Sequence, residues 1–191
     1  QTVHWRLVVF GGTSANRIGI GKAATDDFSL TGTSVPDVAV HNLLWTGAGG
    51  SAWNTLPGNT NWANTDLANV AAPFITNDNV VINLPGTISV DANGVTAGQL
   101  SIGNASGTVA LTGGSITGLA LVKSAAGTAS LNGFNSFPGG VSVTGGILKI
   151  ESDSALGVNP VSIDGAILRT TADVFTVSNP VNVGTAGVTL D

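Results

Sequence analysis

Two aspartates, Asp153 and Asp173, lie twenty residues apart in a chain whose C-terminal part repeats with that spacing. If each repeat forms one layer of a stack, the two carboxylates lie on the same side of that stack. Such a pair has the oxygen ligands that Ca²⁺ prefers, or the acid and nucleophile of a retaining glycosidase. Lys149 and Arg169 share the spacing. A polysaccharide-degrading enzyme is therefore one alternative, but we favour solvated charges at the edge of the stack.

The other residue types that commonly perform chemistry are scattered along the chain. The two histidines, His4 and His41, belong to different segments, and no serine stands out as their partner in a catalytic triad. The run Gly19–Lys22 ends like a phosphate-binding loop, but Asn16 replaces its first glycine and Ala23 its serine or threonine. We therefore predict no catalytic residues, no cofactor and no metal site, and we expect the protein not to be an enzyme.

Three of the four tryptophans, Trp45, Trp53 and Trp62, follow one another closely in a segment that otherwise consists of turn-forming residues. Aromatic side chains at this spacing could line a platform for sugars, which would make the protein a carbohydrate-binding module. The alternative is a cap, because a repeat protein needs an atypical terminal element to cover its core. We favour the cap and keep the sugar platform as a second interpretation.

These side chains must be positioned by the repeat itself, which is clearest in residues 141–191. The segments 141–150, 161–170 and 181–190 align as strand, glycine turn and strand, with a period of about twenty. Short β-branched runs with a fixed period of this length are typical of a solenoid. In a parallel solenoid, neighbouring layers lie about 4.8 Å apart, so equivalent side chains stack into ladders.

The alignment predicts which side chains stack. We expect two apolar ladders in the core, one of Val141, Val161 and Val181, the other of Ile147, Ile167 and Gly187 with Val188 beside it. We also expect Asn159 and Asn179, which occupy the same place in successive turns, to form an amide ladder.

The pattern over residues 121–157 is similar to that of a known repeat family. It comprises a strand with Lys123, a strand beginning at Gly127-Thr128, Phe137 followed by Gly139-Gly140, a turn at Gly145-Gly146, and a closing Ser154-Ala155-Leu156-Gly157. This order resembles the autotransporter-associated β-strand repeat, over roughly residues 43–171. Ala129 and Pro138 depart from it. The resemblance implies a right-handed parallel β-helix that is exported and displayed on the bacterial cell surface, without catalytic residues.

Composition excludes several classes of function. The formal net charge is −5, and the six cations are scattered, so no basic surface for nucleic acid is expected. No apolar run approaches the roughly 18 residues that span a membrane. Few charges, 27 glycines and no cysteine suit an extracellular bacterial surface better than a cytosolic enzyme. Because the chain begins with Gln1, we interpret it as a processed piece of a longer precursor.

We divide the chain into three parts: residues 1–34 form an N-terminal β-strand segment, 35–78 a linker and cap rich in Trp, Gly and Asn, and 79–191 the solenoid, with five to six layers. The short strands of the first part cannot bury a core alone. The last layer offers an edge that other chains can pair with. We therefore expect a homo-oligomer or filament formed by strand pairing, with these assembly residues: Val3, Trp5, Leu7, Val9, Val188 and Leu190. The alternative is that both edges only mark the limits of this piece.

The sequence thus predicts an all-β protein, a right-handed parallel β-solenoid with an N-terminal antiparallel strand segment. The predicted function is that of a non-enzymatic structural or adhesive protein of a bacterial surface, a self-assembling filament subunit with surface glycans as further partners. A carbohydrate-binding module and a polysaccharide-degrading β-helix enzyme are the alternatives.

Overall fold

The protein is all-β in the computed structural model, which describes residues 17–20, 28–31, 40–171 and 176–191. The chain divides into two compact units, Gln1–Ala39 and Val40–Asp191. In the first unit, β1 (Arg17–Ile20) and β2 (Phe28–Thr31) pair antiparallel. This pairing confirms the predicted antiparallel strand segment. The predicted strand from Thr2 to Phe10 lies outside the described residues.

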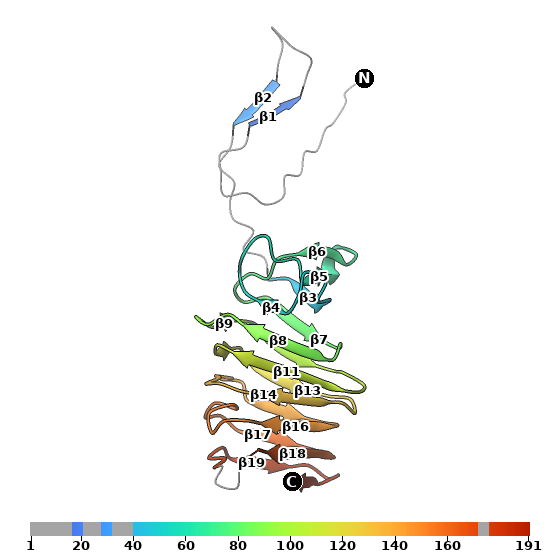
Figure 1. Ribbon diagram of the computed structural model, residues 1–191, viewed down its shortest axis with the longest axis vertical. Coiled ribbons are helices and arrows are strands. Elements are labelled where there is room, and N and C mark those ends of the chain that lie inside the picture. Colours follow the sequence, from blue (N-terminus) through green and yellow to red (C-terminus); the bar gives the residue numbers. More distant parts are fainter. Residues whose placement is uncertain (1–16, 21–27, 32–39, 172–175) are drawn as a thin grey trace. The chain divides into compact units, whose positions relative to one another are not determined.

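The second unit is a parallel β-solenoid, whose strands stack layer on layer (Figure 1). Its first sheet contains seven parallel strands: β3 (Asn42–Trp45), β7 (Asn79–Ile82), β10 (Gln99–Ile102), β13 (Ala120–Lys123), β15 (Val141–Val143), β17 (Val161–Ile163) and β19 (Val181–Val183). Each strand pairs with the equivalent strand of the next layer, so that Val141 lies opposite Val161, which lies opposite Val181. The predicted valine ladder is confirmed.

The second sheet runs along the same stack. It contains seven strands: β4 (Ala52–Trp53), β8 (Gly86–Val90), β11 (Thr108–Gly113), β14 (Thr128–Leu131), β16 (Ile147–Ile150), β18 (Ala166–Thr170) and β20 (Val188–Leu190). Residues 79–191 contribute six strands to each sheet. From the first to the last of these strands, the chain completes about five turns of the solenoid.

A third side of the solenoid is formed by very short strands, β9 (Val95–Thr96) and β12 (Ile116–Thr117), and by a bridge from Thr117 to Ser136. Sequence reasoning missed these strands, because two residues carry no readable alternation. Phe175 and Val177, which alternate with Thr176, predict a further short strand. Thr176 and Val177 belong to no strand, and residue 175 lies outside the described part.

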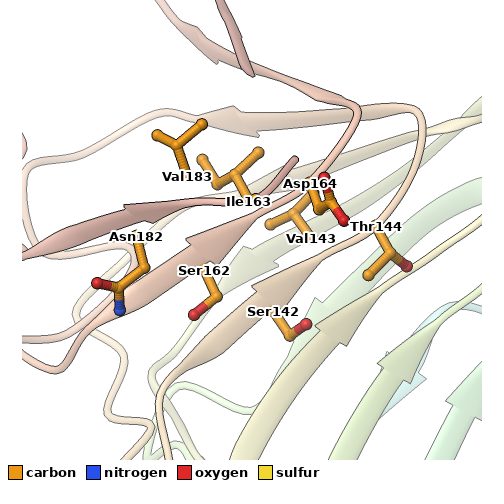
Figure 2. A pocket seen from close by; sticks show the side chains of 9 residues that line it. Ser142, Val143, Thr144, Ser162, Ile163, Asp164, Asn182 and Val183 are labelled. Carbon is orange, nitrogen blue, oxygen red and sulfur yellow. The ribbon is translucent and has the colours of Figure 1, made fainter. Parts of the chain in front are cut away.

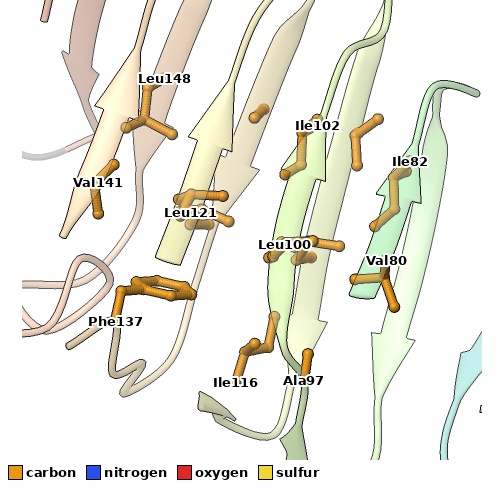
Figure 3. Close-up of a cluster of buried hydrophobic side chains, with 14 of the residues drawn as sticks. Val80, Ile82, Ala97, Leu100, Ile102, Ile116, Leu121, Phe137, Val141 and Leu148 are labelled. Atoms are coloured by element: carbon orange, nitrogen blue, oxygen red, sulfur yellow. The ribbon is translucent and has the colours of Figure 1, made fainter. Parts of the chain in front are cut away.

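The core lies between the sheets, where alternate side chains of each strand point inward (Figure 3). Val80, Leu100 and Leu121 are 0% exposed and pair in register, so that they continue the valine ladder toward the other end. Because every layer contributes aliphatic side chains to inner positions, the core is continuous along the stack.

The second predicted ladder is wrong, because the residues that face the core in β16 and β18 lie one position after the predicted ones. Leu148 and Leu168 are buried in the core and pair with each other, whereas Ile147 and Ile167 are only partly buried on the outer side. In the last layer Leu190, not Gly187, continues the ladder, because the connection from β19 to β20 is longer than the one from β17 to β18. A shift of one residue reverses which side of a strand faces the core.

The predicted amide ladder is also corrected. The side-chain Nδ2 of Asn179 donates to the backbone oxygens of Asn159, at 2.7 Å, and of Gly157, at 3.0 Å. Asn179 therefore binds the backbone of the preceding turn rather than the side chain of Asn159. This arrangement satisfies two carbonyl groups that form no strand pairing there.

The predicted cap segment is continuous with the solenoid. Strands β3 and β4 pair in parallel with β7 and β8 and so form the first layer. Two antiparallel strands, β5 (Trp62–Asn64) and β6 (Val70–Ala72), extend the first sheet beyond it, and a short 3-10 helix, η1 (Thr65–Leu67), connects them. The structure thus places the start of the second unit at Val40, within the segment predicted as linker and cap.

Candidate functional site

The two ends of the solenoid differ, and the candidate site is the end formed by β19 and β20. Among the described strands, each of these two pairs with a neighbour on one side only. Their inward residues are exposed, with Val181 at 42%, Val183 at 55% and Leu190 at 73%. The equivalent residues one layer earlier are at most 5% exposed. We call this surface, formed by Val181, Val183, Val188 and Leu190, the open end.

The open end also presents backbone groups. In the layers before it, the inward residues direct their N–H and C=O toward the following layer, as the Val161 N–H does to the Pro180 oxygen at 2.9 Å. The Ile163 and Leu168 oxygens likewise accept from the N–H groups of Gly184 and Asp191. By the same repeat, the N–H and C=O groups of the four open-end residues point away from the stack. An edge of this kind pairs with a further β-strand, whether that strand is the next layer of the same chain or belongs to another chain.

The structure locates two of the predicted assembly residues, and their role in assembly stays a prediction. Val188 and Leu190 lie at the open end, as expected for residues of an edge strand. Val181 and Val183 were not among the predicted assembly residues, although the predicted valine ladder already placed Val181 in the last layer. Val3, Trp5, Leu7 and Val9 lie outside the described residues.

The opposite end is closed by the tryptophans. Trp53 and Trp62 are 0% exposed and Trp45 is 6% exposed. Their rings pack edge to face, with centroids 4.9 Å apart for Trp45 and Trp62 and 5.2 Å for Trp53 and Trp62, and Phe74 packs beside Trp53 at 5.4 Å. A sugar platform needs exposed ring faces. The structure thus corrects this interpretation, since these three rings form the core of a cap.

A shallow hollow lies on the outer side of the first sheet and reaches the open end (Figure 2). It measures about 220 Å³ and is lined by Ser142, Ser162 and Asn182 from three successive layers, together with Thr144 and Asp164. The Asp164 carboxylate accepts the Ala186 N–H at 2.7 Å, which fixes the long turn between β19 and β20. With one carboxylate, already engaged by the backbone, and no histidine or cation, this lining offers no acid–base pair for catalysis.

On the outer side of the second sheet, Lys149 and Glu151 form an ion pair. The Lys149 Nζ lies 2.8 Å from the Glu151 Oε1, which also accepts the Ser130 hydroxyl at 2.6 Å. These two hydrogen bonds, the one from Lys149 first, hold the pKa of Glu151 below its ordinary value. A carboxylate with a lowered pKa is a poor base for Ser130, so the group stabilises the sheet rather than activating a nucleophile.

The predicted aspartate pair cannot be assembled from what the structure describes. The Asp153 Oδ1 accepts the Thr176 N–H at 3.2 Å, and Asp173 lies outside the described residues. Arg169, predicted to stack on Lys149, does pair with it in register and binds Asp191 through its Nε at 2.8 Å. Within residues 40–171 and 176–191, no three His, Asp or Glu side chains gather as metal ligands.

His41 and Asp78 lie where the chain enters the solenoid. The Asp78 carboxylate, which is fully buried, accepts the backbone N–H groups of His41 and Ile75 and lies 3.2 Å from the His41 Nδ1. Burial raises the pKa of Asp78 against the effect of these hydrogen bonds. The pair anchors the first strand.

Among the described residues, Lys123 is the only charged side chain at an inward position of the first sheet. It pairs in register with Ile102 and Val143 and is 0% exposed. Its Nζ donates to the backbone oxygens of Ser124, of Ala125 at 2.8 Å and of Gly145 at 3.3 Å. The lysine therefore ties together the turns of two successive layers.

We expect Lys123 to make the free energy of unfolding depend on pH in the alkaline range. Burial lowers the pKa of Lys123 from 10.5, so between the lowered value and 10.5 the folded chain binds fewer protons than the unfolded chain. By linkage, the free energy of unfolding then rises with pH in this window. This gain in stability is lost again as the pH falls through the pKa that Lys123 has in the folded chain. Urea unfolding of the wild type and of Lys123→Met at neutral pH and near pH 10.5 checks this. An equal pH dependence of the two proteins would contradict it.

No family model, no curated protein and no solved structure matches the chain. The resemblance to the autotransporter-associated β-strand repeat therefore stays a prediction. Among the described residues, no helix has the length and apolar character that crossing a membrane would require.

Proposed function

We propose that the protein is a non-enzymatic structural or adhesive component of a bacterial cell surface, a stiff rod that is extended by strand pairing at its open end. The observation that carries the proposal is the parallel stacking of two sheets over a continuous apolar core, in which every layer pairs with the next.

The physical basis of this function is mechanical. Layer-to-layer hydrogen bonds run along the stack, and the continuous core resists bending, because interiors of this kind are closely packed. Charged residues make up only 9% of the chain, and the outer positions of the first sheet carry hydroxyl and amide groups such as Ser142, Ser162 and Asn182. Such a surface suits an extracellular protein and contact with surface glycans, which we propose as further partners.

Strand pairing at the open end can build two kinds of assembly. If the added strand comes from a different part of another copy, such as residues 1–34, the contact is heterologous and the product is an open filament. If the same surface is used by both copies, the product is closed. Both arrangements bury Val183 and Leu190 and provide partners for the free backbone groups.

The proposal predicts concentration-dependent assembly that a charge at the open end abolishes. In Val183→Lys, an ammonium group would have to be desolvated against an apolar partner, so sedimentation should show a monomer where the wild type is assembled. Leu119→Lys is the matched control, because Leu119 is 66% exposed and directly precedes β13, three strands from β19 in the first sheet, and it should assemble like the wild type. A wild type that remains monomeric at high concentration would overturn assembly. Antibody labelling of intact cells that produce the protein tests the surface location.

A further inference from the structure

We infer that Asn132–Gly133 is a modification site, at which the folded protein forms a succinimide spontaneously and converts Asn132 to aspartate and isoaspartate. The two residues form a turn that directly follows β14, and the Asn132 side chain is exposed to solvent there. The reactants are the side-chain amide of Asn132, the backbone nitrogen of Gly133 and water. The inference does not depend on the proposed assembly.

The first argument is the position of the attacking nitrogen. The Gly133 N–H donates to the Asn132 Oδ1, with nitrogen and oxygen 2.7 Å apart. Because this oxygen is bonded to Cγ, the hydrogen bond holds the side-chain carbonyl against the nitrogen that has to attack it. Reacting groups held about 3–3.5 Å apart need little further ordering before they react. Gly133 also has no side chain that would cover its nitrogen.

The chemistry needs only hydroxide and water. Hydroxide removes the amide proton of Gly133, and the nitrogen forms a bond to the Cγ of Asn132. The Cγ–Nδ2 bond then breaks, Nδ2 takes a proton from water, and ammonia leaves a succinimide ring behind. Water opens the ring at either carbonyl carbon. Breaking the Cγ–N bond gives aspartate, whereas breaking the backbone C–N bond gives isoaspartate.

The second argument is a comparison within the chain, which contains one other Asn-Gly sequence, Asn93–Gly94. Asn93 is exposed as well, and the φ angles of Gly94 and Gly133 are nearly equal, +81° and +83°. The Gly94 N–H, however, donates to the Asp91 backbone oxygen at 2.7 Å, and the Asn93 Nδ2 donates to the Asp91 Oδ1 at 3.1 Å. Both reacting groups are thus held by Asp91, so Asn93 should be the slower site.

Conversion of Asn132 would change the contacts between two layers. Leu131 pairs with Ile150, so the register places residue 132 beside Glu151. A new carboxylate there would repel the carboxylate of Glu151. In isoaspartate the main chain runs through Cβ and Cγ, which displaces the Asn132 oxygen from the Asn135 Nδ2 that donates to it at 3.1 Å.

Incubation of the folded protein in mildly alkaline buffer, followed by peptide mapping with mass spectrometry, tests the inference. Each conversion replaces an amide NH2 with OH, and chromatography separates the aspartyl from the isoaspartyl peptide. In the folded chain, Asn132 should convert about ten-fold faster than Asn93. In concentrated urea the hydrogen bonds of both turns are lost, so the two Asn-Gly sequences should convert at similar rates.

Asn132→Gln is the matched control, because glutamine keeps the amide but its additional methylene group would require a larger, less favourable ring. This variant should show no conversion at residue 132, while Asn93 reacts as in the wild type. Faster conversion of Asn132 in the folded chain alone would support the inference. Folded protein in which Asn132 converts no faster than Asn93 would overturn it. So would a preference for Asn132 that persists in urea, since the neighbouring sequence rather than the fold would then cause it.

Discussion

Replacing Trp62 with alanine should lower the free energy of unfolding by about 3–5 kcal/mol, as expected for the loss of a large buried aromatic side chain. Trp62 is 0% exposed, and its ring lies 4.9 Å from that of Trp45 and 5.2 Å from that of Trp53. The truncation would leave a cavity at the centre of the cap and expose the first layer of the core. Urea unfolding followed by circular dichroism measures the loss.

Two variants make the result interpretable. Trp62→Phe keeps an aromatic ring and removes an indole N–H that bonds to no acceptor among the described residues, so it should cost less than the alanine variant. Leu56→Ala, at a residue 62% exposed in the same segment, should change stability little. A loss below about 1 kcal/mol in Trp62→Ala would show that the cap does not unfold together with the solenoid.

Replacing Gly114 with alanine should destabilise the solenoid by about 3 kcal/mol or more, because the added methyl group would overlap the backbone of the preceding layer. A Cβ at this position would lie 1.8 Å from the Asp91 oxygen and 3.0 Å from the Gly94 nitrogen. Both contacts are with main-chain atoms, which cannot move aside as a flexible side chain can. The two layers would have to separate at this corner. The midpoint of urea unfolding measures the effect.

Gly58→Ala is the control for Gly114→Ala. A Cβ at Gly58 would meet no atom within 4 Å, so alanine there should leave the stability unchanged or raise it slightly by restricting the unfolded chain. Equal unfolding midpoints for the two variants would contradict the close approach of the layers at Gly114.

The features that the sequence predicted correctly are those that depend on the repeat alone. Val141, Val161 and Val181 are bounded by polar or turn residues, so alternation within each strand leaves one choice for the inward side. The twenty-residue period then places these strands in adjacent layers. The candidate site was predicted in part for the same reason, since Val188 and Leu190 alternate with Thr189.

The features that the sequence did not predict depend on contacts between segments. The strand Ile147–Ile150 has apolar side chains on both sides, so alternation could not decide whether Ile147 or Leu148 faces the core. The lengths of the connecting turns decide this in the folded chain. The strands β9 and β12 are too short to carry a pattern, and they form because the turns of neighbouring layers bring them side by side.

The sequence by itself determined the all-β class, the stacking of layers and the ladder of the first sheet, because a periodic pattern of β-branched residues repeats the same local geometry at every turn. The tertiary structure alone decided which tryptophans are covered, that Lys123 lies in the core, and that one end of the solenoid is capped while the other exposes its ladder. These properties depend on which residues come together from distant parts of the chain.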